Sequence, residues 1–232
     1  MPLSLEEISA LREVPNDTVL ETAIRMLRGR LAVTSSFGAE SALLLSMVAE
    51  IDPSTPVLFL NTLRHFPETL RYRDELVAHL GLQNVHDVMP RSEMLAQRDP
   101  QDQLAAFDPD ACCALRKTEP LFDTLSLYDA WVTGRKRGQA ATRSDMEIVE
   151  PQSDGRARIN PLSDWSRADI EQEIRRRNLP RHPLTGFGFA SIGCAPCTRA
   201  VRPDEDPRAG RWAGHVKTEC GIHLTPADRS TV

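Results

Sequence analysis

The chain has 232 residues, 41% of them hydrophobic and 26% charged, with a formal net charge of −5 at pH 7. This composition excludes a disordered chain and indicates a folded domain with a substantial core. The acidic balance argues against a nucleic-acid binder, which usually presents a broad basic face. No apolar stretch is long enough to span a bilayer, and the first residues show no signal-peptide pattern, so we expect no membrane partner and a cytoplasmic protein with reduced thiols.

Helical and strand-like segments alternate along the first 133 residues. Ser4 and Glu7 form a capping-box pattern at the start of a first helix, and residues 17–30 are expected to form a second. The expected strands are 31–34, 56–60, 85–88 and 130–133, and the expected helices are 41–51, 67–80 and 109 to about 120. This alternation predicts an α/β fold, with a mostly parallel twisted sheet flanked by helices.

The second half of the chain is less regular. Residues 146–149 and 156–159 are expected to pair as a hairpin, and Ser166 with Asp169 caps a helix that runs to about Arg177. Beyond it the sequence is rich in glycine, proline and arginine and is predicted to be irregular. We therefore expect a single domain over 1–232, with a core to about residue 200 and a C-terminal tail over about 201–232.

The loop from Ser35 to Ser41 follows the first expected strand and leads into a helix. In a parallel sheet this position lies at the carboxyl end of a strand, where ligands bind. Serine hydroxyls and the N–H groups at the helix start can hold a phosphate, with Ser35 and Ser36 as the candidate donors. The alternative is an ordinary strand-to-helix turn with serine caps.

Basic residues gather in two short stretches despite the acidic net charge. The first holds Arg135, Lys136, Arg137 and Arg143, and the second holds Arg199, Arg202, Arg208 and Arg211. Two compact basic loops in an acidic chain favour a small anionic ligand over a nucleic acid. Two solvated surface loops are the alternative.

Four of the five cysteines form two pairs, the adjacent Cys112 and Cys113 and the Cys-x-x-Cys pair of Cys194 and Cys197. Adjacent helical residues point about 100° apart, so two neighbouring thiolates fit different atoms of a multinuclear cluster better than one tetrahedral ion. Iron–sulfur clusters take four cysteine thiolates, which is the number available. A structural zinc site is the main alternative, and core cysteines beside an accidental Cys-x-x-Cys are another.

Cys220 is the remaining cysteine. Lys217, His215 and His223 lie near it in the sequence, and cations lower the pKa of a thiol, whereas Glu219 has the opposite effect. These neighbours favour a reactive nucleophile over the alternative, a buried inert cysteine.

Eight segments in this order resemble those of assimilatory adenosine 5′-phosphosulfate (APS) reductases, of the phosphoadenylyl-sulfate/adenylyl-sulfate reductase family. They are Ser35-Ser36-Phe37-Gly38-Ala39-Glu40, Asn61-Thr62 with Phe66-Pro67-Glu68-Thr69, Cys112-Cys113 with Lys117 and Pro120-Leu121, Thr133-Gly134-Arg135-Lys136-Arg137, Asn160-Pro161-Leu162, Ile192-Gly193-Cys194 with Pro196-Cys197-Thr198-Arg199, Arg208-Ala209-Gly210-Arg211-Trp212, and Glu219-Cys220-Gly221-Ile222-His223.

The resemblance implies an adenine nucleotide alpha hydrolase-like fold and a thiol-dependent reduction of APS to sulfite and AMP in sulfate assimilation and cysteine biosynthesis. It implies that Cys220 is the catalytic nucleophile, forming an S-sulfocysteine that thioredoxin or a glutaredoxin-like protein reduces. It also implies a homo-oligomer and a [4Fe–4S] cluster on Cys112, Cys113, Cys194 and Cys197. The substrate-binding residues that it implies are Ser35, Ser36, Lys117, Gly134, Arg137, Arg143, Arg208, Arg211 and His223.

Because all four cluster positions are cysteine, the resemblance favours APS, with the 3′-phosphorylated substrate, or both, as the alternative. Lys117 lies four residues after Cys113, one helical turn on, so we expect it to link the cluster to the substrate. Asn61, Leu63 and Gly138 depart from the family pattern.

Two rival functions differ in features that can be checked. ATP pyrophosphatases share the implied fold, but this chain lacks the doubled glycine of their phosphate loop. A zinc-stabilised nucleotide-binding sensor is a remote alternative, and it predicts zinc and no special role for Cys220.

Overall fold

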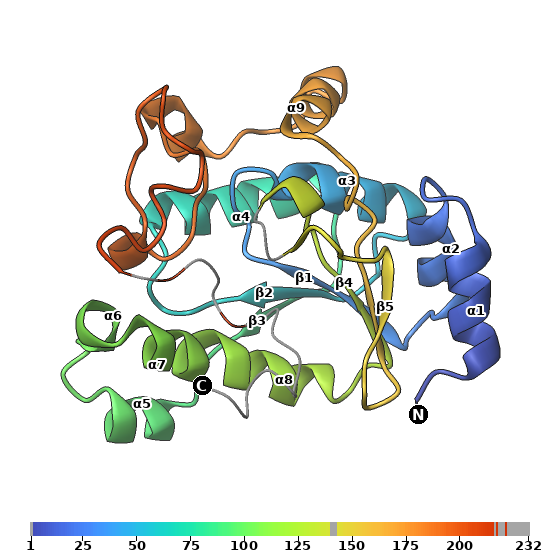
Figure 1. Ribbon diagram of the computed structural model, residues 1–232, viewed down its shortest axis with the longest axis horizontal. Helices are drawn as coiled ribbons and strands as arrows, with labels where there is room; N and C mark the ends of the chain where they lie inside the picture. Colours follow the sequence, from blue (N-terminus) through green and yellow to red (C-terminus); the bar gives the residue numbers. More distant parts are fainter. Residues whose placement is uncertain (1, 140–142, 216, 218–220, 222–232) are drawn as a thin grey trace.

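The computed structural model describes residues 2–139, 143–215, 217 and 221, and it shows a six-stranded sheet between layers of helices (Figure 1). The strands are β1 (Leu31–Ser35), β2 (Val57–Leu60), β3 (Val85–Val88), β4 (Ala130–Val132), β5 (Val149–Pro151) and β6 (Ala157–Ile159). Their order is β3-β2-β1-β4-β6-β5, with β5 antiparallel to β6 and every other pair parallel. The mostly parallel α/β fold is thereby confirmed.

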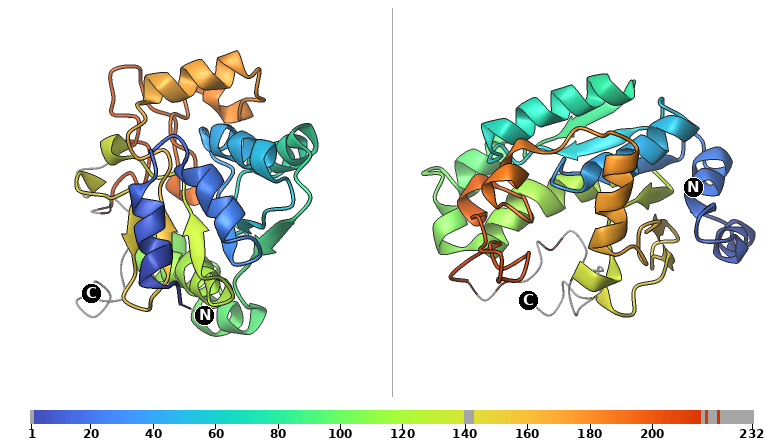
Figure 2. Two further views of the ribbon diagram at one scale, coloured as in Figure 1. Left: turned by 90° about the vertical axis from the view of Figure 1, so that its right-hand side faces the viewer. Right: turned by 90° about the horizontal axis from the view of Figure 1, so that it is seen from above.

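Helices cover both faces of this sheet. The α-helices are α1 (Leu5–Glu13), α2 (Val19–Met26), α3 (Ser41–Ile51), α4 (Pro67–Leu80), α5 (Ser92–Arg98), α6 (Leu104–Phe107), α7 (Pro109–Cys113), α8 (Glu119–Leu125) and α9 (Arg167–Arg176). A π-helix, η1 (Ala114–Thr118), joins α7 to α8, and short 3₁₀ turns are η2 (Arg137–Gln139), η4 (Pro183–Phe187) and η5 (Ala195–Cys197). Figure 1 shows α3 and α4 on one face and α7 and α8 on the other, and the turned views in Figure 2 show the same layering.

Successive side chains of β1 are buried on alternate faces of the sheet. Leu31 and Val33 belong to the core cluster that includes α2 and α3, whereas Ala32 packs with Leu121 and Leu125 of α8. Side chains of successive strand residues point to opposite faces, so an apolar run without polar interruptions suits a strand between two helical layers. Among the described helices, none has the length and apolar character needed to cross a membrane.

The helix that carries Cys112 and Cys113 is longer than the sequence predicts. It continues past Pro120 to Leu125 because η1 widens the turn before the proline, with Glu119 N–H bonding to Ala114 C=O. Pro120 therefore lies in the first turn of α8. Proline has no backbone N–H, and in the first turn of a helix this missing donor costs no hydrogen bond. The helix predicted over 17–30 is shorter, since Leu27 already leaves helical geometry.

The strand order creates a switch point between β1 and β4. From β1 the chain crosses through α3 to β2 on one side, while β4 pairs with β1 on the other. The loops that follow β1 and β4 therefore diverge and leave a crevice at the carboxyl ends of these strands, the usual ligand position in an open α/β sheet.

The segment after α9 returns to this edge of the sheet. Ala195 N–H donates to Arg64 C=O at 2.7 Å, and His65 forms an isolated antiparallel bridge with Cys194. Figure 1 shows this segment, in orange and red, reaching the region where α6 and α7 begin. The Cys-x-x-Cys turn is thus brought beside the start of the helix that carries the adjacent cysteines.

Candidate active site

A cavity of about 480 Å³ lies at the crevice between β1 and β4. Its walls come from the loops after β1 and β4, the start of α9, η1 and the segment 190–212. Seven of the nine predicted substrate-binding residues line it, namely Ser35, Ser36, Lys117, Gly134, Arg143, Arg208 and Arg211. Arg137 is not among the lining residues, and the predicted residues Cys220 and His223 lie outside the described part of the chain. The volume suits a small-molecule ligand.

The loop between β1 and α3 offers backbone N–H groups to the cavity. Among the described residues, no side chain caps the start of α3. Its first N–H, on Ser41, donates to Gly38 C=O at 3.2 Å, and the other N–H groups of the first turn are available to an anion. Ser35 Oγ accepts a hydrogen bond from Phe37 N–H at 3.1 Å, which holds the loop in its turn. A Cβ atom on Gly38 would lie 3.2 Å from Ile192 C=O, so the glycine allows the loop to approach the C-terminal segment closely.

Three residues of the first basic stretch are paired with carboxylates. The pairs are Arg135–Glu150 at 2.8 Å, Lys136–Glu40 at 2.6 Å, and Arg137–Asp164. Pairing balances much of the positive charge that the sequence alone assigns to this loop. Arg143, the fourth member, is buried, lines the cavity and donates to Gln139 at 2.5 Å.

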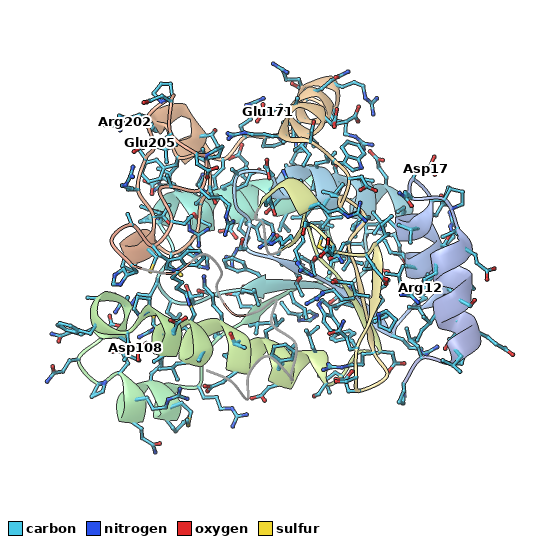
Figure 3. All side chains as sticks on the ribbon, in the orientation of Figure 1. Arg12, Asp17, Asp108, Glu171, Arg202 and Glu205 are labelled. Carbon is cyan, nitrogen blue, oxygen red and sulfur yellow. The ribbon has the colours of Figure 1, made fainter. Side chains whose placement is uncertain are left out.

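The second basic stretch divides in a similar way. Arg199 and Arg202 both bind Glu205, and Figure 3 shows Arg202 and Glu205 side by side away from the sheet. Arg208 and Arg211 instead face the cavity. The guanidinium carbon of Arg211 lies 4.5 Å from the centre of the Trp212 ring, a cation–π contact that orients it.

The cavity is cationic although the chain is acidic. Its described lining includes seven lysine or arginine residues and two carboxylate residues. The cations are Lys117, Arg135, Lys136, Arg143, Arg167, Arg208 and Arg211, and the carboxylates are Glu40 and Asp206. A concave surface of one dominant sign concentrates ligands of the opposite charge, so this cavity favours an anion.

The structure brings cysteines from two distant segments together. Cys112, Cys113 and Cys194 are buried and Cys197 is half-buried. Burial raises the pKa of the Cys112 thiol, and negative charge on Cys194 and Cys197 raises it further, so the three sulfur atoms interact electrostatically. Asp108 fixes the start of α7 by accepting a hydrogen bond from Ala111 N–H at 2.9 Å.

Cys194 is the thiol that connects the cysteines to the cavity. Burial disfavours its thiolate, but the Lys117 charge, a hydrogen bond with Thr62 and the Arg211 charge outweigh burial and lower its pKa. The Thr62 hydroxyl lies 3.2 Å from Cys194 Sγ. Because Lys117 and Arg211 also line the cavity, these two cations act on both regions.

These four cysteines suit a thiolate-bound cluster. Four sulfur donors, three of them buried, lie beside cations that offset negative charge, which is the chemistry an iron–sulfur cluster requires. Among the described residues, no three histidine, cysteine, aspartate or glutamate side chains form a group that could hold one metal ion.

Sequence reasoning missed a buried network behind the cysteines. Arg116 is 5% exposed, and it binds Asp99 at 2.8 Å and Asp102 at 2.7 Å. It also reaches Thr62 C=O at 3.4 Å, which ties it to the residue beside Cys194. An arginine next to Lys117 gives no sequence signal of burial, since its partners are set by tertiary packing.

The sequence profile of the phosphoadenosine phosphosulfate reductase domain matches residues 30–200. The chain belongs to this reductase family. The matched range spans both cysteine pairs and most of the cavity lining.

Relatives within the family carry two names. The chain is 51% identical to an adenosine 5′-phosphosulfate reductase of Chelativorans sp. (strain BNC1), over 90% of this chain and 85% of the relative. It is 40% identical to a protein of that name from Streptomyces coelicolor, over 94% and 95% of the two chains. A phosphoadenosine 5′-phosphosulfate reductase of Gloeobacter violaceus is 39% identical, over 89% of this chain and 88% of the relative.

Solved structures support the same family and fold. The phosphoadenylyl-sulfate (PAPS) reductase of Candida auris, in a phosphate complex, matches with a TM-score of 0.68 at 27% identity, over 84% of this chain and 97% of that chain. An FMN adenylyltransferase of Candida glabrata matches with a TM-score of 0.57 at 14% identity, over 97% and 88% of the two chains, which shows a shared fold.

Two of the three departures from the family pattern lie outside the cavity lining. Asn61 donates to Asp87 at 2.8 Å and accepts from Leu63 N–H at 3.1 Å. Leu63 has a φ of +61°, a left-handed conformation that glycine adopts at lower cost. Gly138, the third departure, lines the cavity.

Proposed function

We propose that this protein reduces adenosine 5′-phosphosulfate to sulfite and AMP, with a dithiol protein such as thioredoxin as the electron donor. The observation that carries the proposal is the cationic cavity at the β1–β4 switch point, with Lys117 shared between that cavity and Cys194. The relatives named as APS reductases support the choice of substrate.

The lining residues supply binding and charge neutralisation. The open N–H groups of α3 and the Ser35–Ser36 loop suit the phosphate, and Arg208 and Arg211 suit the sulfonate. Neutralising oxygens that gain charge in the transition state is the main contribution a protein makes to this kind of group transfer. Lys117, which also lines the cavity, can do the same.

The proposed nucleophile is Cys220. Its thiolate attacks the sulfonate sulfur, a new S–S bond forms, and the bond from that sulfur to the bridging phosphate oxygen breaks as AMP leaves with the electron pair. A donor thiolate then attacks Cys220 Sγ and sulfite leaves, and the second donor thiol restores Cys220. Gly221, the next residue, lies close to η1, since a Cβ there would be 3.4 Å from Thr118 Oγ1.

We also propose that Cys112, Cys113, Cys194 and Cys197 hold a [4Fe–4S] cluster. When bound, such a cluster would supply a fixed charge distribution beside Lys117 and would pin the C-terminal segment to α7. Iron and acid-labile sulfide analysis of the purified protein tests this assignment. Stoichiometric zinc without sulfide would support the zinc-stabilised alternative instead.

One experiment tests the reaction directly. The purified protein is incubated with APS without reductant, and peptide mass spectrometry locates any sulfonate adduct. We expect the adduct on Cys220, its release as sulfite by thioredoxin, and no adduct in the Cys220→Ser variant. If protein that retains its cluster forms no adduct, this result would falsify the proposed reaction.

The second candidate substrate is the 3′-phosphorylated nucleotide, because the Gloeobacter violaceus relative carries that name. The same incubation with that nucleotide distinguishes the two candidate substrates. A faster adduct with APS supports the proposal, and a faster adduct with the 3′-phosphorylated form supports the alternative.

A further inference from the structure

A closed ring of hydrogen bonds lies directly behind the wall of the cavity formed by Gly134. Glu150 Oε2 accepts from Asn160 Nδ2 at 2.7 Å, and Asn160 Oδ1 accepts from Thr133 Oγ1 at 2.7 Å. Thr133 Oγ1 in turn accepts from Arg135 N–H at 3.4 Å, and Arg135 Nη1 donates to Glu150 Oε2 at 2.8 Å. We call these four residues the Glu150 ring.

The ring holds both flanks of one lining residue. Gly134 lies between Thr133 and Arg135, and all three line the cavity. Gly134 has no side chain of its own to fix it, so its position depends on its two neighbours. Thr133 N–H also donates to Ile159 C=O at 2.9 Å, which anchors the ring to β6.

Thr133, Arg135 and Asn160 are buried, and Glu150 is half-buried. Asn160 is 0% exposed, and its amide also donates to Glu147 C=O at 2.9 Å, so its two N–H groups and its oxygen all have partners. Burial disfavours the Glu150 carboxylate, but a hydrogen bond and the charges of Arg158 and Arg135 keep its pKa below the ordinary value. An ionised carboxylate makes stronger hydrogen bonds than a neutral one.

The ring also controls where a cation points. Glu150 holds the Arg135 guanidinium in the ring, and Arg135 also lines the cavity. Without that carboxylate, Arg135, Arg158 and Asn160 would each lose an acceptor. The loop that carries Gly134 would then have two fewer constraints.

We propose that Glu150, which is not in the cavity lining, is a positioning residue that acts through the Glu150 ring to set the Gly134 wall against the nucleotide. This inference rests on the proposed function, since it assumes that the cavity binds an adenine nucleotide. It assigns Glu150 to ground-state binding of the nucleotide and not to the sulfonate chemistry at the Lys117 side.

The test is AMP binding measured by calorimetry on the protein with its full metal content. Thr133→Val should raise the Kd for AMP several-fold, whereas Thr133→Ser, which keeps the hydroxyl, should restore it. Glu150→Gln should raise the Kd about tenfold. Thr124→Val is the matched control, because it also removes a hydroxyl hydrogen bond, to Pro120 C=O at 2.9 Å, but in α8 away from the cavity.

A double-mutant cycle decides whether the residues act as one unit. If Glu150 acts on the Gly134 wall through the ring, the double variant Glu150→Gln with Thr133→Val should raise the Kd for AMP by less than the product of the two separate effects. In turnover assays the single variants should raise KM with little change in kcat.

Wild-type AMP affinity in both single variants, or effects that simply multiply, would overturn the ring as a positioning device. If Glu150→Gln does not fold, Glu150→Asp, which keeps the carboxylate but shortens its reach, takes its place, and wild-type AMP affinity in that variant and in Thr133→Val would overturn the proposal. A wild-type protein that binds no AMP would overturn the proposed function itself, which is a separate result.

Discussion

Gly134 is the residue at which the shape of the cavity can be tested without disturbing the fold. A Cβ added there would lie 3.6 Å from Leu44 Cδ2, an ordinary contact, on the side of the cavity. We expect Gly134→Ala to leave the free energy of unfolding unchanged or to raise it by about 0.5 kcal/mol, since alanine restricts the unfolded chain. Affinity for AMP, measured by calorimetry, should fall about tenfold.

The control for this substitution is Gly186→Ala. Gly186 lies in η4, outside the cavity lining, and a Cβ there would meet no atom within 4 Å. This variant should keep the wild-type affinity for AMP. Equal AMP affinity in Gly134→Ala and wild type would show that the nucleotide does not contact this wall.

Substitution of Lys117 tests the catalytic rate separately from substrate binding. It lines the cavity and its charge lowers the pKa of Cys194. Removing one charge that stabilises a transition state costs roughly 100-fold in rate. We expect Lys117→Ala to lower kcat for sulfite formation by about that factor, while iron and acid-labile sulfide content stay unchanged. A kcat equal to wild type would contradict the proposed link, and Lys117→Arg should retain part of the rate.

At the level of elements, local signals in the sequence predicted helix starts well. The Ser166–Asp169 pattern forms a full capping box, with Asp169 N–H to Ser166 Oγ at 3.1 Å and Ser166 N–H to Asp169 Oδ2 at 2.9 Å. Expected bounds such as 41–51, 67–80 and 85–88 also agree with α3, α4 and β3. These signals succeed because caps and apolar periodicity are decided within a few residues.

Side-chain partners that lie far apart in the sequence could not be predicted. Arg135 and Lys136 line the cavity, yet both pair with carboxylates 15 or more residues away in the chain. Arg137 pairs with Asp164 and is not among the lining residues. The π-helix could not be foreseen either, since no local pattern announces an i→i+5 turn. The assignment of the four cysteines to one cluster, made from their count and spacing, stays a prediction, whereas Thr62 and Arg116 gave no signal in the sequence.

The cap of α9 gives an element-scale prediction. Ser166→Ala removes the acceptor for Asp169 N–H and should lower the free energy of unfolding by about 1 kcal/mol, measured by urea denaturation. Ser153→Ala, an exposed serine outside the helices, is the control and should change it by less than about 0.5 kcal/mol. An equal loss in both variants would show that the cap contributes nothing specific.

At the scale of the whole molecule, the site exists only when the segment after α9 is docked on the core. Tyr72 Oη donates to Pro180 C=O at 3.0 Å, and Thr69 Oγ1 lies 2.9 Å from His182 Nε2, so α4 holds the start of that segment. Further on, the segment supplies Cys194 and Arg211 to the site. Stability of this docking therefore governs both the cysteine site and the cationic cavity.

His182 makes that docking sensitive to acid. The side chain is 0% exposed, and burial lowers its pKa to about 4, from an ordinary value near 6.5. Between these two values the unfolded chain binds a proton that the folded protein excludes, so stability is complete above about pH 6.5 and falls as the pH drops toward 4. The loss is up to about 3 kcal/mol across the window.

Urea denaturation at several pH values tests this dependence. The difference in unfolding free energy between wild type and His182→Gln should be largest at pH 7 and should shrink toward pH 5, because the variant lacks the titrating group. His65, whose pKa burial also lowers, is present in both proteins, and its charge lowers the pKa of His182, so the two groups act in the same direction. A difference that stays constant from pH 7 to pH 5 would contradict the prediction. If the variant does not fold, an NMR titration of His182 in the wild-type protein gives its pKa directly, and a value near 6.5 would exclude acid-sensitive docking.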